Sequence, residues 1–373
     1  MSRQRIIALL GKRDTPTDAV EEYCRHLGEA LQAHDYELIV ERVGWDKRGW
    51  ASAFRTLRGQ ARGWRGTWVL VQYTALAWSA RGFPLRLLRV LKMLNAAGVR
   101  VGVVYHDVEP FGGKRLIDRL RRRAQLRTMR EARRVAEASI VTVPAEKLSW
   151  MRQQRDVPIF IPVGANLSVS TPASSRAHIA GDGKLAIAVF GITGGEAGKK
   201  EIERIAGAIR FVTPRVKNLR LIVFGRNSET AETEMRTALH GTEVELHVLG
   251  VLSEENVVRT LTVSDVLLFV RGPISSRRGS AIAGIACGLP VIAYAGPETA
   301  PPITEAGLAL FSPQRKGDLG EVLLRVLEDV HYRASLAQQS WVAQQQYFSW
   351  RTIAARYAEF LGRPDPLRTA SED

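Results

Sequence analysis

Residues 266–293 read VLLFVRGPISSRRGSAIAGIACGLPVIA. Five apolar residues, Val266–Val270, lead into a polar, basic loop, and a helical apolar pattern begins at Ala281. A strand, a loop and the start of a helix therefore meet here. Such a junction directs free backbone N–H groups and the positive end of the helix toward the carboxyl edge of a parallel sheet. The stretch predicts an α/β unit with an anion site at that edge.

The same alternation of short apolar runs and longer helical patterns extends along the whole chain, as in a parallel sheet with crossover helices. Helix-like stretches follow many of the runs, and the pattern is fully helical after Phe311. We expect two doubly wound units. The expected strands of the first are Ile6–Leu10, Glu37–Glu41, Trp68–Val71, Val101–Tyr105 and Ser139–Val143, and those of the second are Leu185–Phe190, Leu219–Phe224, Glu245–Val248, Val266–Val270 and Val291–Tyr294. Expected helices are Asp18–Ala33, Pro84–Ala97, Asp318–Glu328, Tyr332–Gln346 and Trp350–Leu361.

The length of 373 residues exceeds the roughly 250 to 300 at which single cores stop growing. A stretch rich in Ser, Ala, Gly and Pro separates the two series, which marks a connection between domains. We therefore expect an N-terminal domain over 1–165, a linker over 166–184, a C-terminal domain over 185–345, a last helix over 346–361 and a polar tail over 362–373.

The composition, 45% hydrophobic and 24% charged, is that of an ordinary soluble protein, and no apolar run approaches the roughly 18 residues of a membrane span. The first residues show no export signal, so we expect a cytoplasmic protein. Cys24 and Cys287 lie in apolar patterns, away from histidines at metal-ligand spacing, and we expect both to be reduced and buried, with no metal site. The net charge of +15 favours anionic partners.

The basic loop supplies candidate anion ligands. Gly279 and Ser280 are small enough for a phosphate to approach the helix start closely. Arg277 or Arg278 can add charge-assisted, bidentate hydrogen bonds to a diphosphate. The alternative is a solvated basic turn, because such turns are common on protein surfaces.

The loop and helix continue as Ala286-Cys287-Gly288-Leu289-Pro290-Val291, and the turn Gly296-Pro297-Glu298 follows. This continuation resembles family 4 glycosyltransferases. Two further segments, Leu249–Glu255 and Ser264–Val266, fall in the family's order. The resemblance covers the second half of the chain. It implies the GT-B fold, with two Rossmann-like doubly wound domains facing each other across a cleft that holds the active site, and a nucleotide-diphosphate sugar as the donor substrate without a further cofactor.

The resemblance also implies donor-binding residues. Gly250, Val251 and Leu252 match the loop beside the nucleobase. Gly191, with Lys199 or Lys200, matches the loop that binds the donor phosphates, although Ile192 stands where the family has an arginine. The glycines after this strand can instead form a simple flexible turn. The family's paired glutamates are absent, because Ser275 and Ala283 occupy their positions.

In the first half, Val103–Tyr105 ends a strand and His106-Asp107-Val108-Glu109 follows. Reacting groups of open α/β sheets lie at such carboxyl ends. Family members often carry His-Asp here, with the histidine near the transferred sugar, so we name His106, Asp107 and Glu109 as candidate catalytic residues. Asp107 would orient His106 or cap a turn, and Glu109 would accept a proton from an acceptor hydroxyl.

Upstream, Asp14 or Asp18 is a candidate helix N-cap. Tyr73 and Trp78 would either stack on an acceptor or belong to the core, and we assign Trp350 to packing.

The segment Lys114–Arg134 has ten basic residues interleaved with apolar ones at helical spacing. It would dock on an anionic membrane surface and bring the protein to a lipid-linked acceptor at the inner face of the plasma membrane. The alternatives are nucleic-acid binding, which no groove-reading motif supports, and a solvated helix.

The leading hypothesis is a metal-independent, retaining glycosyltransferase that moves a sugar from a nucleotide-diphosphate donor to a hydroxyl acceptor such as a lipid-linked glycan or polysaccharide precursor. The missing glutamates motivate one alternative, a non-catalytic assembly or regulatory subunit of the same fold. A nucleotide-sugar epimerase, which shares the fold, is the other.

Overall fold

The structure is a computed structural model that describes residues 3–151, 157–169 and 183–363. Packing divides the chain into unit 1, Met1–Pro162 with Trp350–Asp373, and unit 2, Val163–Ser349. Most of the linker expected over 166–184, and nearly all of the tail expected over 362–373, lie outside the described residues.

Unit 1 is built on a six-stranded sheet in the order β2-β1-β3-β4-β5-β6, and every recorded strand pair is parallel. The central strands are near-continuous apolar runs because helices cover both faces; all six residues of β3 are buried. The strands are β1 Gln4–Leu10, β2 Tyr36–Arg42, β3 Trp68–Tyr73, β4 Arg100–Tyr105, β5 Ala138–Val141 and β6 Ile159–Phe160.

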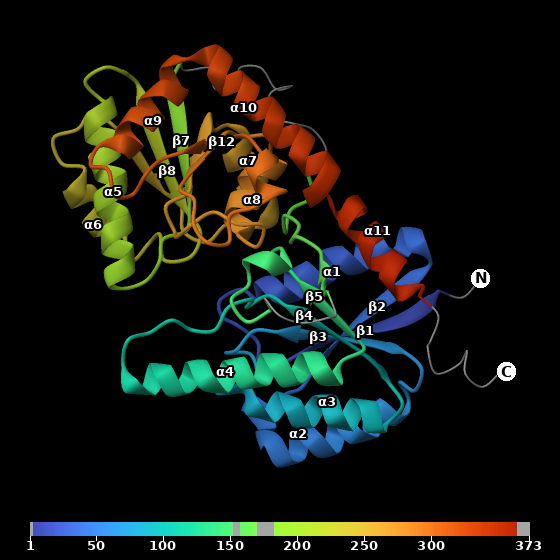
Figure 1. The fold of residues 1–373 in the computed structure, drawn as a ribbon. Coiled ribbons are helices and arrows are strands. Elements are labelled where there is room, and N and C mark those ends of the chain that lie inside the picture. The colour runs from blue at the N-terminus through green and yellow to red at the C-terminus, as the bar shows by residue number, and fades with distance from the viewer. Residues whose placement is uncertain (1–2, 152–156, 170–182, 364–373) are drawn as a thin grey trace. The chain divides into compact units, whose positions relative to one another are not determined.

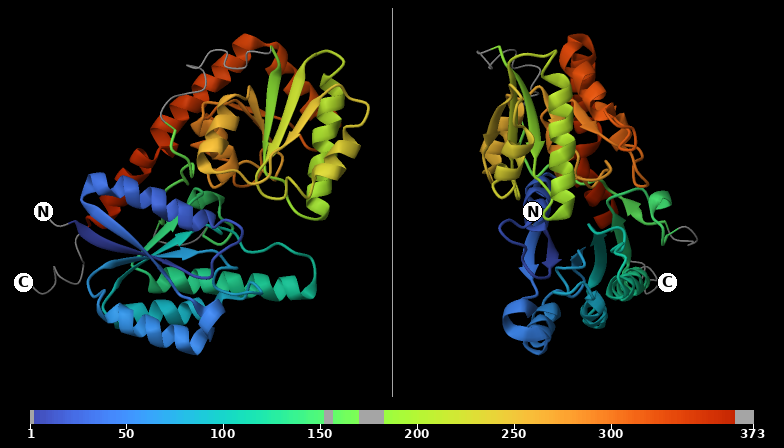
Figure 2. Two further views of the ribbon diagram at one scale, coloured as in Figure 1. Left: turned by 180° about the vertical axis from the view of Figure 1, so that it is seen from behind. Right: turned by 90° about the vertical axis from the view of Figure 1, so that its left-hand side faces the viewer.

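Figures 1 and 2 show the helices of unit 1 in two layers, α1 and α11 on one face of the sheet and α2, α3 and α4 on the other. Asp18 caps α1, since its Oδ1 accepts from the amides of Val20 and Glu21 at 3.1 and 3.2 Å. The expected N-cap is thereby confirmed. The helices are α1 Ala19–Leu31, α2 Trp45–Arg62, α3 Leu87–Ala96, α4 Leu116–Val135 and α11 Trp350–Leu361.

The last helix, α11, belongs to unit 1 although unit 2 precedes it in the chain. Trp350 stacks on His26 at 5.4 Å between ring centroids, and Phe360 meets Trp68 edge-on at 5.1 Å. Trp350 is therefore a packing residue, as the sequence predicts. Tyr73 and Trp78 are each 1% exposed, so both belong to the core.

Unit 2 repeats the architecture with a second sheet in the order β12-β11-β10-β7-β8-β9, again with parallel pairs. Its strands are β7 Leu185–Phe190, β8 Leu219–Phe224, β9 Glu245–Val248, β10 Val266–Leu268, β11 Val291–Ala293 and β12 Leu308–Leu310. Its helices are α5 Glu196–Val212, α6 Glu232–Ala238, α7 Glu254–Thr262, α8 Gly279–Ala286, α9 Asp318–Glu328 and α10 Val330–Ala343. Figure 1 shows α5 and α9 on one face of this sheet and α7 and α8 on the other.

The expected α/β fold of two doubly wound units is confirmed, with differences in detail. The strands β6 and β12 were not expected, because two or three residues are too few to show a period. The helix expected over Tyr332–Gln346 is α10 followed by a π turn over Gln344–Phe348. Cys24 and Cys287 are both buried and unbridged. In the described part of the chain, no helix is long and apolar enough to span a bilayer.

Candidate functional site

In unit 2, the loops after β7 and β10 meet at the carboxyl edge of the sheet. Gly191 follows β7 and has φ +81°, a left-handed conformation that favours glycine. A Cβ at this position would lie 2.5 Å from Nη1 of Arg271, so a larger residue would displace the guanidinium from its present place. The glycine therefore makes room for a guanidinium that comes from the β10–α8 loop.

Arg271 and Arg278 are two half-buried arginines in this loop. Burial lowers the pKa of Arg271 below its usual value; nearby Glu201 opposes the shift and Arg226 adds to it. Burial, followed by the charge of Arg277, likewise lowers the pKa of Arg278. The lowered values mean that the charged form of each side chain carries an energetic cost which a bound anion would relieve.

The recorded contacts of these two side chains are to backbone carbonyls. Arg278 donates from Nε to Pro273 O at 3.2 Å, and Nη1 of Arg271 lies 3.5 Å from Phe190 O. Among the described residues neither guanidinium forms an ion pair. Glu201, the carboxylate near Arg271, accepts a hydrogen bond from the amide of Thr193 at 2.8 Å.

Arg277, the other predicted arginine, is neutralised within the protein. It forms a bidentate pair with Glu298, with Nε–Oε2 and Nη2–Oε1 distances of 2.7 and 2.8 Å. Ser275 donates to the same carboxylate at 3.2 Å. Burial acts to raise the pKa of Glu298, but the hydrogen bonds and charge of Arg277 outweigh it, so the pKa lies below its usual value. A carboxylate therefore lies beside Ser275, which occupies one of the two positions where this sequence lacks the glutamate of the family pattern.

The helix α8 begins at Gly279, with Arg278 as its N-cap residue and no side-chain cap. Gly279 is exposed and Ser280 half-buried, and their amides are the first two of the helix, which have no partner within it. Arg271 links the predicted residues, because its guanidinium lies against Gly191 and its charge acts on Arg278 at the start of α8. Gly191, Arg278 and the start of α8 therefore lie in one region.

The other predicted donor residues of unit 2 lie on the turn after β9 and on α5. Gly250 is buried with φ +67°, and its carbonyl accepts from the amide of Gly225 at 2.6 Å, while Val251 is 48% exposed and Leu252 half-buried. On α5, Lys199 and Lys200 are exposed, and Lys199 pairs with Glu196 at 3.1 Å. The structure therefore places the lysines in solvent.

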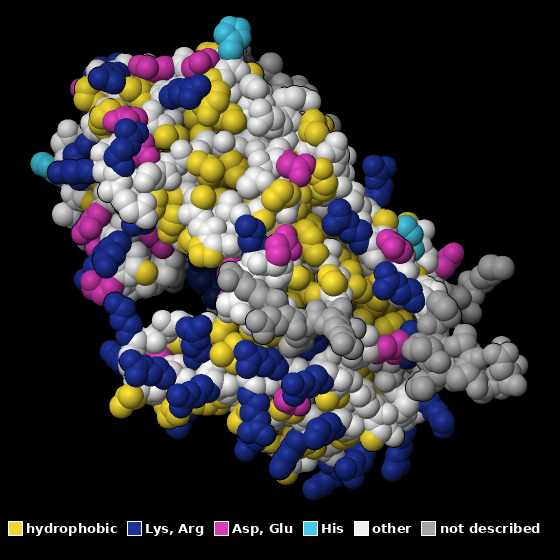
Figure 3. Space-filling view, in the orientation of Figure 1, with side chains coloured by type: hydrophobic (Ala, Val, Ile, Leu, Met, Phe, Trp, Pro, Cys, Tyr) yellow, Lys and Arg dark blue, Asp and Glu magenta, His cyan; other side chains and the backbone are white. Residues whose placement is uncertain are grey.

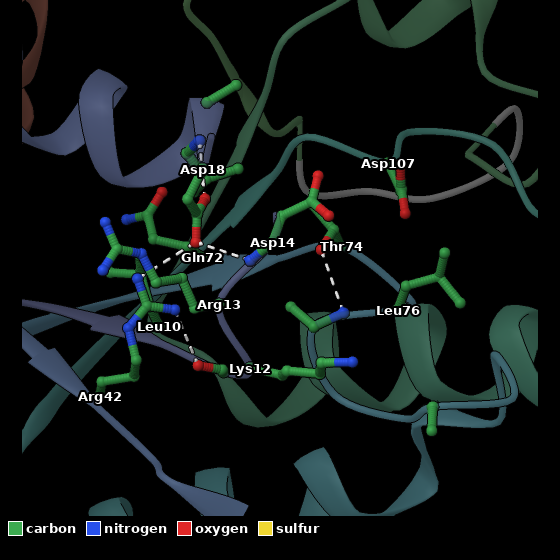
Figure 4. A pocket seen from close by; sticks show the side chains of 15 residues that line it. Leu10, Lys12, Arg13, Asp14, Asp18, Arg42, Gln72, Thr74, Leu76 and Asp107 are labelled. Carbon is green, nitrogen blue, oxygen red and sulfur yellow. Dashed lines mark hydrogen bonds and ion pairs between the residues drawn. The ribbon is translucent and has the colours of Figure 1, made fainter. Parts of the chain in front are cut away.

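Unit 1 has its own cavity of about 350 Å³ at the carboxyl ends of β1, β3 and β4 (Figure 4). Gly11 is required at its wall, because a Cβ there would lie 2.2 Å from Ala77 O. Arg42 bridges two wall segments through Gly11 O at 3.0 Å and Asp18 at 3.1 Å. The lining combines apolar residues with polar ones, which include Lys12, Arg13, Asp14, Gln72, Thr74 and Asp107.

His106 follows β4, and its ring is held by Gln72, a residue that also lines the cavity. Gln72 Nε2 donates to Leu70 O at 3.0 Å, which leaves its Oε1 to accept from His106 Nε2 at 2.8 Å. The histidine is therefore the Nε2–H tautomer. Removal of the ring from water lowers the pKa of His106 to about 4, with Asp18 acting in the opposite direction, so the ring is neutral at pH 7.

The other two candidate catalytic carboxylates have structural contacts. Asp107 lines the cavity, and its carboxylate accepts a hydrogen bond from the amide of Ala75 at 2.7 Å. The hydrogen bond recorded for the His106 ring is donated to Gln72. Glu109 accepts from the amide and hydroxyl of Ser149 at 2.5 and 2.6 Å. Of the three predicted residues, Asp107 alone lines the cavity, and His106 adjoins it through Gln72. No group of three or more potential metal ligands occurs among the described residues.

Reasoning from the sequence missed Arg271, Glu298 and Gln72 as members of these sites. Each had a signal: Arg271 is the charged residue that ends an apolar run, and Gln72 is a buried amide inside another. Glu298 belongs to the quoted turn, but its pairing with Arg277 depends on how that turn folds back.

No family model matches the sequence, and no curated protein sequence matches it. Solved structures do. HepE from Anabaena, solved with UDP and glucose, is 16% identical over 96% of this chain and 99% of its own, with a TM-score of 0.66. Sucrose-phosphate synthase from Thermosynechococcus elongatus is 18% identical over 100% of both chains, with a TM-score of 0.68. The fold is GT-B.

GT-B similarity also extends to a structure described as a UDP-N-acetylglucosamine 2-epimerase from Listeria monocytogenes. It is 13% identical over 98% of this chain and 99% of its own, with a TM-score of 0.59. At 13 to 18% identity these comparisons establish the GT-B fold of the chain.

Proposed function

We propose that this chain is a glycosyltransferase that moves a sugar from a nucleotide-diphosphate donor to a hydroxyl acceptor. The observation that carries the proposal is the pair Arg271 and Arg278, half-buried beside the start of α8 and without an ion pair among the described residues. A diphosphate would bring compensating charge and bidentate acceptors to two guanidiniums that now repel each other.

The same groups would serve the chemistry as well as binding. When the bond between the sugar and the diphosphate breaks, negative charge grows on the leaving group. Preorganised arginines and the amides of Gly279 and Ser280 would stabilise that charge without a metal ion. Arg277 would act differently, because Glu298 already balances it.

The acceptor hydroxyl would bind in the cavity of unit 1. Its wall offers the carboxylates of Asp14 and Asp107 and the cation of Lys12, a mixture that suits a polyhydroxylated acceptor. His106, neutral and fixed by Gln72, would contact the sugar by hydrogen bonding and not by charge. A family 4 classification, retention at the anomeric carbon and a lipid-linked acceptor remain part of this proposal.

Two other functions fit the same fold. Likeness to a protein described as an epimerase favours a nucleotide-sugar epimerase, which would also need the diphosphate site. The residues Ser275 and Ala283, in place of the family's glutamates, favour a non-catalytic subunit. The proximity of Glu298 to Ser275 supports the catalytic proposal, because it restores a carboxylate there.

A panel of nucleotide sugars tests these functions with the purified full-length chain. Nucleotide release that requires an added acceptor supports transfer, and an isomerised donor formed without acceptor identifies an epimerase. Release should fall with Arg278→Gln and persist in Arg236→Gln, which removes an exposed arginine of α6 in the same unit. If every donor leaves both turnover and the melting temperature unchanged, the proposal is wrong.

A further inference from the structure

The positive charge of this protein is concentrated on one face of unit 1. The helices α2, α3 and α4 carry fifteen Lys and Arg residues against three carboxylates, a net charge of +12 out of +15 for the chain. On the other face of the same sheet, α1 and α11 carry three Arg against four Glu, a net charge of −1. Figure 3 shows the Lys and Arg side chains gathered over the α2–α4 layer.

Between α2 and α3 lies a groove of about 730 Å³ that is separate from both candidate sites. Its cations are Arg58, Arg62, Arg89 and Lys92, all exposed and without an ion pair among the described residues. Its floor is apolar, formed by the half-buried Phe54 and Met93 and by alanines. The groove therefore combines an apolar floor with four positive charges that no ion pair in the described part of the chain balances.

The adjacent helix α4 presents a stripe directly opposite its buried side. Residues 116, 120, 123, 127, 130 and 134 follow steps of three or four and lie on one helix face, away from the buried Gln125, Met129 and Ala132. Two of the six are exposed leucines, Leu116 at 78% and Leu120 at 53%, and four are exposed arginines. The most outward line of the helix is thus amphiphilic.

We propose that the α2–α4 layer is a membrane-docking face, in which the α2–α3 groove binds the phosphate headgroup of an anionic phospholipid. The four cations would pair with the headgroup, and Phe54 and Met93 would contact its glycerol and upper acyl chain. Leu116 and Leu120 would enter the interface beside the arginines of α4. This extends the docking predicted for Lys114–Arg134 to a defined lipid site on two other helices.

Charge complementarity with apolar content favours a lipid surface over nucleic acid. Nucleic-acid backbones would satisfy the arginines but would leave Leu116 and Leu120 in contact with water and phosphate. A bilayer interface accepts both kinds of side chain at the same depth. The inference does not depend on the proposed glycosyl transfer, because it concerns a face and a groove with other residues.

Liposome cosedimentation of the full-length chain tests the proposal, with vesicles of phosphatidylcholine alone or with 30% phosphatidylglycerol. The triple variant Arg58→Gln, Arg62→Gln, Arg89→Gln should bind the anionic vesicles roughly 100-fold more weakly, since each basic side chain near the surface contributes about fivefold. The matched control Arg25→Gln, Arg351→Gln, Arg356→Gln loses the same charge from the opposite face and should change binding less than twofold. Melting curves check that both variants fold.

Other outcomes are equally decisive. Equal losses of vesicle binding in the two triple variants would show that net charge alone drives binding, and would overturn the assignment of a lipid site to the groove. Binding to a 20-base-pair DNA duplex that the groove variant abolishes, with no vesicle binding, would assign the face to nucleic acid. Leu116→Ser with Leu120→Ser should weaken vesicle binding most at 0.5 M salt, where charges are screened; no change there would remove the leucines from the proposal.

Discussion

At the scale of single residues, pairing with a carboxylate divides three half-buried arginines of one loop into two kinds. Arg277 is balanced by Glu298, whereas Arg271 and Arg278 remain half-buried with like charges around them. Holding such charges together reduces the stability of the unbound protein, as is common at binding sites. Removal of one of them should therefore affect binding and stability in opposite directions.

We predict that Arg271→Gln weakens binding of inorganic pyrophosphate by about 10- to 100-fold, the loss of a charged hydrogen-bonding partner. The same change should leave the free energy of unfolding unchanged or raise it, because burial and repulsion are relieved. Calorimetric titration and urea unfolding measure the two effects, with Arg236→Gln as the control. A destabilised variant with normal pyrophosphate affinity would contradict the assignment.

A second prediction concerns the protonation of His106. Its pKa is about 4 in the folded protein and near 6.5 in an unfolded chain, so between these values only the unfolded state binds the proton. The contribution of the neutral His106 ring to the free energy of unfolding is therefore fully present above about pH 6.5. It falls by on the order of 3 kcal/mol as the pH is lowered toward 4.

Urea unfolding at pH 5 and pH 7.5 tests this. His106→Gln should reduce the difference in unfolding free energy between the two pH values, while His240→Gln, an exposed histidine, should preserve it. An unchanged difference in His106→Gln would show that the ring titrates normally.

At the scale of elements, α11 is a structural part of unit 1. Phe360 is 2% exposed and packs on Trp68 and Tyr357, at 5.1 and 5.9 Å between ring centroids. Phe360→Ala should destabilise unit 1 by roughly 3 to 5 kcal/mol, the usual cost of such a cavity. Unfolding followed by hydrogen exchange should show faster exchange in β1 and β3 and unchanged protection in β7 and β8. Equal loss in both sheets would mean that the units unfold together.

The elements were largely predictable, because buried parallel strands and amphipathic helices have distinct periods. The runs at β1, β3, β4, β7 and β8 carry that pattern clearly. The three-residue β12 and the π turn after α10 do not, since pairing with a neighbour and local packing decide them.

The site was predictable only in part, for a physical reason. Sequence identifies the basic loop, but pairing with a carboxylate decides which of its arginines is available, and that pairing depends on contacts from elsewhere in the chain. Glu298 reaches Arg277 from the turn after β11, and Gly191 admits Arg271 from the loop after β10. Neither contact can be predicted from the spacing of the residues in the sequence.

At the scale of the whole molecule, the chain leaves unit 1 after Pro162 and returns to it at Trp350. Unit 2 is therefore continuous in sequence, while unit 1 is assembled from two distant pieces. Domains can fold as they leave the ribosome. The sheet of unit 1 is made first, but the side of α1 that packs against α11 stays uncovered until the last helix is translated. The core of unit 1 therefore depends on a segment that is made only after the whole of unit 2.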